Sequence, residues 1–361
     1  MREMSPRERV LETLRRRVPD RMPITLDVGA SAGIDRAYID VFRRRTGAAD
    51  PAEYFDYDIR FVPAPLTATA DDFRAYYNEV PPGTTFDEFG VGHVPVKDFP
   101  LGQDLHPWEG FDSPRQIEEY PLPVFELRKE TVAAIQALKG RGYAVSVASG
   151  SINEWCYYLR GMDAFMMDFA LAPDMAAAML ERVAGLCAAI GAALAGAGAD
   201  ILCFYGDMGS QTRLLLGPKM WAEWIEPRWK RIIASVRGAS PEALVFYHSC
   251  GFIEPIIPGL IESGFDILNP VQPESMDPVV IKRKFGELIS LWGGIGMQST
   301  MLCGSPADVE RAVRSLVESW APGGGAIVTA AQTMLPDVPW ENVVALVQAV
   351  REHGRTARAS L

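Results

Sequence analysis

The sequence predicts an α/β fold in which short parallel strands alternate with helices and close into a (β/α)8 TIM barrel. Apolar runs alternate with longer helical stretches from about residue 124 to the end of the chain. These runs are short and continuously apolar, as in parallel strands that are buried on both faces. No Gly-x-Gly-x-x-Gly turn follows the first expected strand, which argues against a doubly wound dinucleotide-binding sheet.

The elements are expected in a regular order. Ser5 can cap a first helix that contains Pro6 and extends to about Arg17. Strands are expected at residues 23–28, 144–149, 201–205, 243–247, 266–269, 289–292 and 326–330. Helices are expected at residues 34–46, 127–139, 173–197, 218–236, 253–263, 278–285, 306–320 and 340–353.

Residues 1–361 are expected to form a single domain, because α/β barrels commonly run from about 250 to over 400 residues as one unit. Residues from about 50 to 123 are irregular and rich in Pro, Asp and aromatic residues. We interpret them as an insertion near the barrel mouth. Alternation at residues 83–96 predicts a hairpin within it.

Composition limits the possible functions. The net charge of -11 argues against nucleic acid as a partner. Five irregularly spaced cysteines do not form a disulfide framework, which favours a reducing cytoplasm. The N-terminal stretch has no apolar signal region, and the uncharged runs at 183–199 and 288–307 are interpreted as a packed helix and as a strand with a loop. We therefore expect a cytoplasmic enzyme that does not enter a membrane.

Polar residues follow the expected strands. In a TIM barrel the chemistry lies at the carboxyl ends of the strands. Asp27 ends the first expected strand, and Asp207 follows the strand at 201–205. The other polar residues at strand ends are Ser149, Ser151, His248, Cys250, Asn269, Gln272, Gln298 and Gln332. We expect these side chains to share one site at the barrel mouth.

The segment His248-Ser249-Cys250-Gly251 is the sharpest candidate for a metal site. Residues two apart on an extended segment face the same way, so His248 and Cys250 can point at one ion. Zinc takes imidazole nitrogen and thiolate sulfur, and a catalytic zinc usually has three protein ligands. The third ligand is left open among Cys303, Asp207 and Glu274. The alternative is a hydrogen-bonded histidine beside an inert thiol.

Acidic and aromatic residues provide further candidates. Asp207 lies in a glycine-flanked turn, where it would contact substrate or transfer a proton, or simply form the turn. Asp87 and Glu88 are adjacent, so on a strand only one of them would enter a cavity. Tyr157 and Tyr158 are expected to pack unless one faces the cavity.

Several ordered segments resemble the uroporphyrinogen decarboxylase superfamily, in particular its corrinoid-linked methyltransferase branch. They are PRERVLETLRRRVPDRMPI, GSINEWCYYLRGMDAFMMDFALAPD, GDMGSQTRLLLGPKMWAEWIEP, FYHSCGFIEPIIPGLIESGFDILNPVQP, WGGIGMQSTMLCGSPADVERAV and PDVPWENVVALVQAV. Because the resemblance covers nearly the whole chain, it implies a uroporphyrinogen decarboxylase-like barrel.

The resemblance to the methyltransferases implies a zinc-assisted reaction. In that branch the His-x-Cys pair binds zinc with a later cysteine, and His248 and Cys250 match the pair. The position of the later cysteine is Gln332 here, so that ligand is replaced. The implied reaction moves a methyl group between a small methyl donor, or a thiol or ether substrate, and a separate corrinoid protein.

The resemblance to the decarboxylases implies other roles. Asp87 matches the decarboxylase Asp, and Tyr158 matches its Tyr, so these two and Asp207 are the candidate catalytic residues. The first-strand segment TLDVGASAGI contains no Arg, although a polycarboxylate substrate needs Arg partners. Arg213 or Arg160 would have to supply the cation.

The candidate substrate-binding residues are Asp27, Asn269, Gln272, Gln298 and Gln332. Three functions stay open: methyl transfer, decarboxylation of a tetrapyrrole or aromatic acid, and a non-catalytic barrel that binds a tetrapyrrole or small ligand. The oligomeric state is also open, with a homodimer as one alternative.

Overall fold

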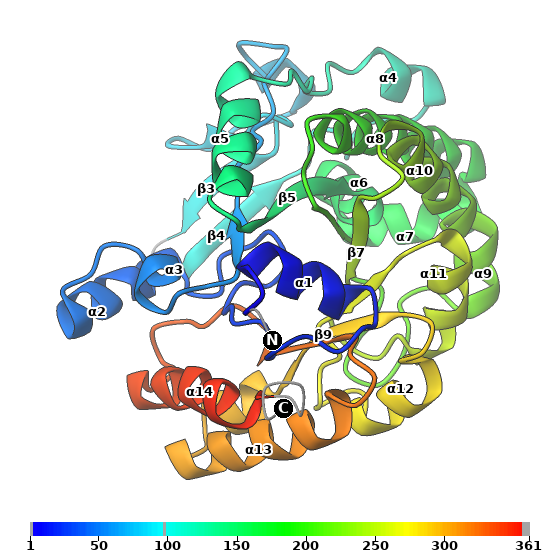
Figure 1. The fold of residues 1–361 in the computed structure, drawn as a ribbon. Helices are drawn as coiled ribbons and strands as arrows, with labels where there is room; N and C mark the ends of the chain where they lie inside the picture. Colours follow the sequence, from blue (N-terminus) through cyan, green and yellow to red (C-terminus); the bar gives the residue numbers. More distant parts are fainter. Residues whose placement is uncertain (1–2, 97–98, 356–361) are drawn as a thin grey trace.

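The computed structural model describes residues 3–96 and 99–355. Its main sheet contains seven parallel strands in the order β1-β5-β6-β7-β8-β9-β10. Their bounds are Ile59–Phe61 (β1), Ala144–Ser151 (β5), Ile201–Tyr205 (β6), Leu244–His248 (β7), Ile267–Asn269 (β8), Ser290–Ile295 (β9) and Ala326–Ala330 (β10). Helices follow the strands and surround them (Figure 1). The predicted α/β barrel is confirmed, and every strand predicted from residue 144 onward overlaps an observed one.

The strand predicted at residues 23–28 is wrong, because this segment joins no named strand. Two of its N–H groups donate to side chains instead of to a neighbouring strand. The Ile24 N–H donates to the Asp58 carboxylate at 2.6 Å, and the Asp27 N–H donates to the Thr25 hydroxyl at 3.0 Å. Pro23 has no N–H to donate. β5 pairs with β6 on one side and with β1 on the other, and β1 lies in the region that the sequence assigned to the insertion.

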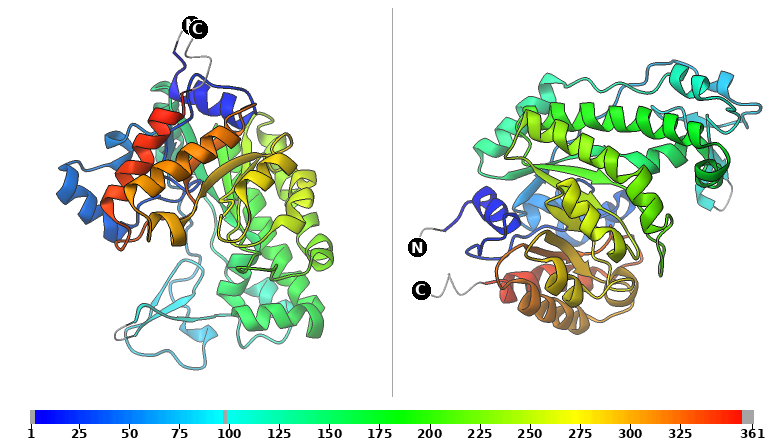
Figure 2. Two further views of the ribbon diagram at one scale, coloured as in Figure 1. Left: turned by 90° about the horizontal axis from the view of Figure 1, so that it is seen from below. Right: turned by 90° about the vertical axis from the view of Figure 1, so that its right-hand side faces the viewer.

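The insertion contains the predicted hairpin. β2 (Thr85–Phe86) and β3 (Gly92–Val96) pair antiparallel, and β4 (Phe99–Leu105) extends them to a three-stranded sheet. This small sheet projects from the barrel in the left view of Figure 2. The short elements α3 (Pro51–Tyr54), η1 (Arg74–Tyr76) and α4 (Pro114–Glu119) complete the region.

Most predicted helices are present. They are α1 (Pro6–Leu14), α2 (Arg36–Thr46), α5 (Lys129–Gly140), α8 (Pro173–Gly196), α12 (Pro278–Phe285), α13 (Pro306–Trp320) and α14 (Trp340–His353). The helix predicted at 218–236 is divided into α9 (Pro218–Trp224) and α10 (Glu226–Ala239), because Pro227 has no N–H with which to continue a helix. The helix predicted at 253–263 begins with a 3-10 turn, η2 (Glu254–Ile256), followed by α11 (Ile257–Ser263). Helices α6 (Ile152–Arg160) and α7 (Met162–Leu171) were not predicted.

Side-chain alternation along the strands separates two apolar cores. The strand residues of the inner core are Ile59, Ala144, Ile201, Cys203, Leu244, Phe246, Ile267, Trp292 and Ile327. Val10 and Leu14 of α1 join this core and are fully buried. α1 therefore covers the base of the barrel, the end at which the strands begin (Figure 1).

A network of ion pairs lies at this base. Nη1 of Arg9 is 2.6 Å from Oδ1 of Asp58, and Nε of Arg9 is 2.7 Å from Oδ1 of Asp20. Nη1 of Arg21 is 2.7 Å from Oδ2 of Asp58. Arg9 and Asp58 are each 1% exposed, so these pairs are shielded from water. Removing one partner would leave a buried charge uncompensated, which makes the network structural.

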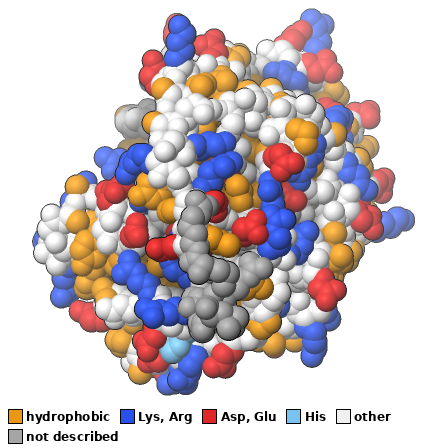
Figure 3. Space-filling model, in the orientation of Figure 1, with side chains coloured by type: hydrophobic (Ala, Val, Ile, Leu, Met, Phe, Trp, Pro, Cys, Tyr) orange, Lys and Arg blue, Asp and Glu red, His pale blue; other side chains and the backbone are white. Residues whose placement is uncertain are grey.

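Among the described residues, α8 is the helix with the length and composition needed to cross a membrane. It packs along α10 and over β5, and it buries Met175, Met179 and Leu180. Its apolar residues therefore contribute to the core of the fold, as the sequence predicted for residues 183–199. On the face shown in Figure 3, basic and acidic side chains are interspersed.

Candidate metal centre at the barrel mouth

Three side chains with metal-binding atoms meet where β6 and β7 end. Asp207 follows β6, His248 ends β7 and Cys250 follows it, and their ligand atoms lie within 4.8 Å of one another. Sγ of Cys250 is 3.3 Å from Nε2 of His248, and Nε2 is 3.7 Å from Oδ1 of Asp207. Ligands of a tetrahedral zinc ion lie roughly 3.3–3.8 Å apart, given bonds of about 2.0–2.3 Å. The donor types and these spacings fit a single ion.

Asn269 at the end of β8 orients His248. Nδ1 of His248 is 2.5 Å from Oδ1 of Asn269, and Nδ2 of Asn269 donates to the Trp292 carbonyl at 2.8 Å. Because the amide nitrogen of Asn269 donates to Trp292, the amide oxygen of Asn269 faces the imidazole. It accepts a hydrogen bond from the Nδ1–H group of His248. Nε2 of His248 is then left with a lone pair for a metal. Asn269, predicted to bind substrate, thus lies behind the histidine.

Two residues of α6 hold the main chain of Asp207. Oε1 of Glu154 accepts the Asp207 N–H at 2.9 Å, and Nδ2 of Asn153 donates to the Asp207 carbonyl at 3.0 Å. The Asp207 carboxylate accepts the Cys250 N–H at 2.7 Å. Burial, followed by the Asp207 charge, raises the pKa of Glu154 to about 7. Sequence reasoning missed Asn153 and Glu154 because it did not predict α6, although Ser151 at its N-cap was a usable signal.

The thiol of Cys250 contacts the side chain of Gln332. Nε2 of Gln332 donates to Sγ, so residue 332, at which the resemblance implies a later cysteine, lies beside Cys250. Burial raises the pKa of Cys250, and the negative charges of Asp207 and Glu154 raise it further. A cation bound beside the sulfur would oppose this effect and favour the thiolate.

The other two third-ligand candidates lie outside this cluster. Cys303 is exposed. Oε1 of Glu274 accepts the N–H groups of Gln298 and Ser299, each at 3.1 Å, where the π-helical turn η3 (Met297–Met301) begins. Among the described residues, the acidic group that joins His248 and Cys250 is Asp207.

Two glycines bring the ligand-bearing loops together. A Cβ atom on Gly209 would lie 2.6 Å from the Cys250 carbonyl oxygen, and one on Gly251 would lie 2.5 Å from the Ser210 carbonyl oxygen. Gly251 also has a φ of 77°, which favours glycine. The Phe252 N–H donates to the Ser210 carbonyl at 2.8 Å. The loops after β6 and β7 therefore touch main chain to main chain.

A cavity of about 410 Å³ opens beside Cys250. We call it the glutamine cavity, because its lining includes Gln211, Gln272, Gln298 and Gln332. Asp337, Leu302 and Leu335 also line it. Three of the residues predicted to bind substrate, Gln272, Gln298 and Gln332, therefore share one cavity with the predicted metal ligand Cys250.

Asp27 lies apart from this cluster. It lines another cavity, of about 240 Å³, together with Asp50 and Arg60. Burial raises the pKa of Asp27 to about 7. Arg60, which sequence reasoning missed, is 6% exposed, and its Nε and Nη2 atoms have no hydrogen-bond partner. Nη2 of Arg60 is 3.6 Å from the Glu53 carboxylate, the ion-pair partner of this buried guanidinium.

Asp87 and Tyr158 also lie outside the glutamine cavity. Oδ1 of Asp87 accepts the N–H groups of Phe89 and Val91, each at 2.9 Å, and so shapes the turn between β2 and β3. Tyr158 on α6 is 45% exposed, and its ring packs against that of Tyr157 with centroids 5.1 Å apart. The structure therefore does not bring either residue to the cluster of ligand atoms.

A third cavity, of about 250 Å³, lies on the other side of Glu154. Ser149 and Ser151, at the end of β5, line it with Glu88. Of the adjacent pair Asp87 and Glu88, the one that enters a cavity is therefore Glu88. Glu154 lines this cavity and contacts Asp207, so it separates the cavity from the ligand cluster.

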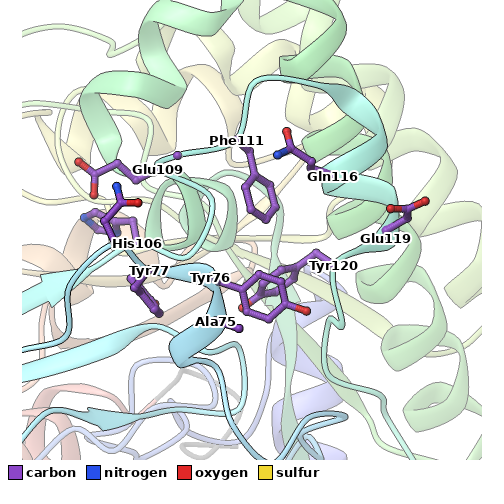
Figure 4. Close-up of a pocket in the computed structure, with 11 residues that line it drawn as sticks. Ala75, Tyr76, Tyr77, His106, Glu109, Phe111, Gln116, Glu119 and Tyr120 are labelled. Atoms are coloured by element: carbon purple, nitrogen blue, oxygen red, sulfur yellow. The ribbon is translucent and has the colours of Figure 1, made fainter.

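A larger cleft of about 870 Å³ lies beside the small sheet and α4. Figure 4 shows His106, Tyr77 and Glu109 on one side of it, with Phe111, Gln116 and Glu119 across from them. None of the three ligand residues lines it. Its size therefore does not make it the site of the predicted chemistry.

The matching family model and the relatives of known name carry the same description, uroporphyrinogen decarboxylase. The sequence model described as uroporphyrinogen decarboxylase (URO-D) matches residues 99–353. A uroporphyrinogen decarboxylase from Coxiella burnetii is 24% identical over 245 residues, 65% of this chain and 64% of the relative. One from Magnetococcus marinus is 26% identical over 99 residues, 27% of each chain. The match to the Coxiella protein thus spans less than two thirds of its length.

A solved structure shares nearly the whole fold. It is described as a methyltransferase from Methanosarcina mazei, with a TM-score of 0.65 and 18% sequence identity. The match covers 97% of this chain and 99% of the other. At this identity, the likeness shows the fold alone.

Proposed function

Because the chain belongs to the uroporphyrinogen decarboxylase family, we propose that it is a zinc-assisted methyltransferase of that superfamily. It moves a methyl group between a small methyl donor, or a thiol or ether substrate, and a corrinoid carried by a partner protein. The observation that carries the proposal is the cluster of Asp207, His248 and Cys250 beside the glutamine cavity. Three protein ligands and an open side are typical of a catalytic zinc site.

Asp207, His248 and Cys250 would hold the metal, with Asp207 in place of the later cysteine. Their oxygen, nitrogen and sulfur donors suit zinc. When bound, zinc supplies a Lewis acid that favours the thiolate form of a thiol substrate or polarises an ether oxygen. Gln332 donates a hydrogen bond to Sγ of Cys250, which spreads the negative charge of a thiolate there.

The remaining residues position these three and admit the substrate. Asn269 fixes the His248 tautomer, and the contacts from Asn153 and Glu154 hold Asp207. The glutamine cavity has the size of a small-molecule site. Leu302 and Leu335 line it and are 37% and 51% exposed, so they give it an apolar edge at which a partner protein would dock.

Elemental analysis of the purified protein tests the proposal, with His248→Ala and Cys250→Ala as the ligand variants. Cys303→Ala is the matched control, because this cysteine is exposed and outside the cluster. We expect one zinc per chain in the wild type and in the control, and none in the ligand variants. Methyl transfer from free methylcobalamin to 2-mercaptoethanol should be lost with the zinc. A wild type without stoichiometric zinc, or transfer unaffected by His248→Ala, would contradict the proposal.

Decarboxylation is the second candidate, because the curated relatives carry that name. It needs a cation for the substrate carboxylates. Arg160 already donates hydrogen bonds to the Asp168 carboxylate, at 2.9 Å, and to main-chain carbonyls. Arg213 lies on an exposed turn and does not line the glutamine cavity. Turnover of uroporphyrinogen by the purified protein would favour this candidate over methyl transfer.

A further inference from the structure

The lining of the glutamine cavity combines side-chain amides with one negatively charged carboxylate. Asp337 is the charged side chain in its lining, and no Lys, Arg or His of the described residues contributes to it. We propose that the cavity selects a small cationic or neutral substrate that donates hydrogen bonds, such as an amine- or hydroxyl-bearing thiol or thioether, and rejects anions. This inference rests on the proposed function and specifies its substrate class.

The hydrogen-bonding capacity of the lining supports this selectivity. Gln211 donates its NH2 group to the Glu274 carbonyl at 3.3 Å, and Gln332 donates its NH2 group to Sγ of Cys250. The amide oxygens of both are left as acceptors, together with the carboxylate of Asp337. A substrate that carries N–H or O–H groups would satisfy them.

Gln272 provides the opposite capacity. It is 7% exposed, and its Oε1 accepts the Gly251 N–H at 3.1 Å. Because a peptide N–H only donates, this contact fixes the amide orientation and leaves the NH2 group for the ligand. One such donor group, with the exposed Gln298, cannot satisfy a carboxylate or sulfonate as a guanidinium would.

The charges behind the lining act in the same direction. Oε2 of Glu274 is buried without a hydrogen-bond partner, and Asp337 lies in the lining itself. Ion pairs within the described part of the chain include none to either of these carboxylates. A zinc ion bound to one thiolate, one carboxylate and one neutral imidazole has no net charge, so it would not offset these carboxylates. An anionic substrate would meet like charges, and an ammonium group would meet opposite ones.

Three matched thioethers test the selection without a titrating thiol: 2-(methylthio)ethylamine, 2-(methylthio)ethanol and 3-(methylthio)propionate. Calorimetry would measure their affinities for the full chain, both metal-free and zinc-loaded. We expect the amine to bind about tenfold or more tightly than the carboxylate, with the alcohol between them. A carboxylate that binds as tightly as the amine, or an amine that does not bind, would overturn the inference.

Asp337→Asn should reduce the ratio of amine to carboxylate affinity several-fold, because it removes the charge from the lining. Asp163→Asn, on the exposed surface of α7, is the matched control and should leave the ratio unchanged. An unchanged ratio in Asp337→Asn would also count against the inference. The affinities can be measured on metal-free protein, without zinc or a corrinoid. The substrate selectivity and the proposed function are therefore tested independently. Protein without zinc that prefers the amine would refute only the function, and zinc-dependent transfer with a carboxylate preference would refute only the selection.

Discussion

Acidic side chains have opposite kinds of neighbour at the two ends of the barrel. At the base, the carboxylate of Asp58 lies within 2.7 Å of two guanidinium groups, from Arg9 and Arg21. At the mouth, Glu154 and Asp207 lie together, and burial and this proximity raise the pKa of Glu154 to about 7. The comparison teaches that carboxylates paired with guanidinium groups stabilise the fold, whereas two acidic groups placed side by side disfavour the charged form of one of them.

The largest expected effect is the difference between two matched substitutions. Asp58→Asn leaves Arg9 and Arg21 without their shared carboxylate, so it should lower the free energy of unfolding by about 3 kcal/mol or more. Asp207→Asn retains an oxygen for the Cys250 N–H and removes a charge beside Glu154, so it should cost less than about 1 kcal/mol without metal. Denaturant unfolding of metal-free protein measures both. Equal losses would show that the two ends do not differ in this way.

A smaller effect is expected behind His248. Asn269→Ala removes the acceptor of the Nδ1 proton and should weaken zinc binding by about 10–100-fold, measured by competition with a chelator. Asn342→Ala is the control, because Asn342 is also fully buried and its NH2 group donates to the Met301 carbonyl at 2.9 Å. The control should lose stability but keep its zinc affinity. A comparable loss of zinc affinity in both variants would show that Asn269 does not orient His248 for zinc binding.

The smallest expected effect concerns pH. Burial raises the pKa of Asp27 to about 7, so folding favours the protonated carboxyl. Its contribution to stability is complete below about pH 4, the unfolded pKa, and is lost as pH rises through about 7. Because the side chain is partly exposed, we discount the effect to about 2 kcal/mol between pH 4 and pH 8.

Asp27→Asn should remove this loss, as measured by unfolding at several pH values. The pKa of Asp20, at the base, is shifted in the opposite direction. Burial alone would raise its pKa, but hydrogen bonds from Arg9 and the Met4 N–H lower it, so its contribution is lost as pH falls. A wild-type stability that does not fall relative to Asp27→Asn between pH 4 and pH 8 would contradict the assignment.

The sequence predicted those parts of the site that depend on local geometry. His248 and Cys250 are two residues apart on an extended segment, so alternation alone places their side chains together. Gln332 was paired with them through the resemblance, and it does contact Cys250. The predicted strands from residue 144 onward are short, continuously apolar runs whose burial is evident from composition.

The parts that sequence reasoning missed depend on contacts between distant segments. β1 has three residues and contains Arg60, so no apolar run marks it. Asn269 was assigned to substrate because its position at a strand end gives no sign that its amide faces a neighbouring histidine. Asp27 was placed in the site as the end of a strand, but the segment forms no strand and the side chain lines another cavity.

The close approach at Gly209 and Gly251 has a consequence for how this centre can change. The separation of the two loops is set by peptide groups in contact, so it does not depend on which side chains project from them. A substitution at position 332, which follows β10, can therefore change the polarity and charge next to Cys250 while the spacing of the two loops is kept. The chemistry at this end of the barrel can therefore vary through single substitutions that leave both loops in place.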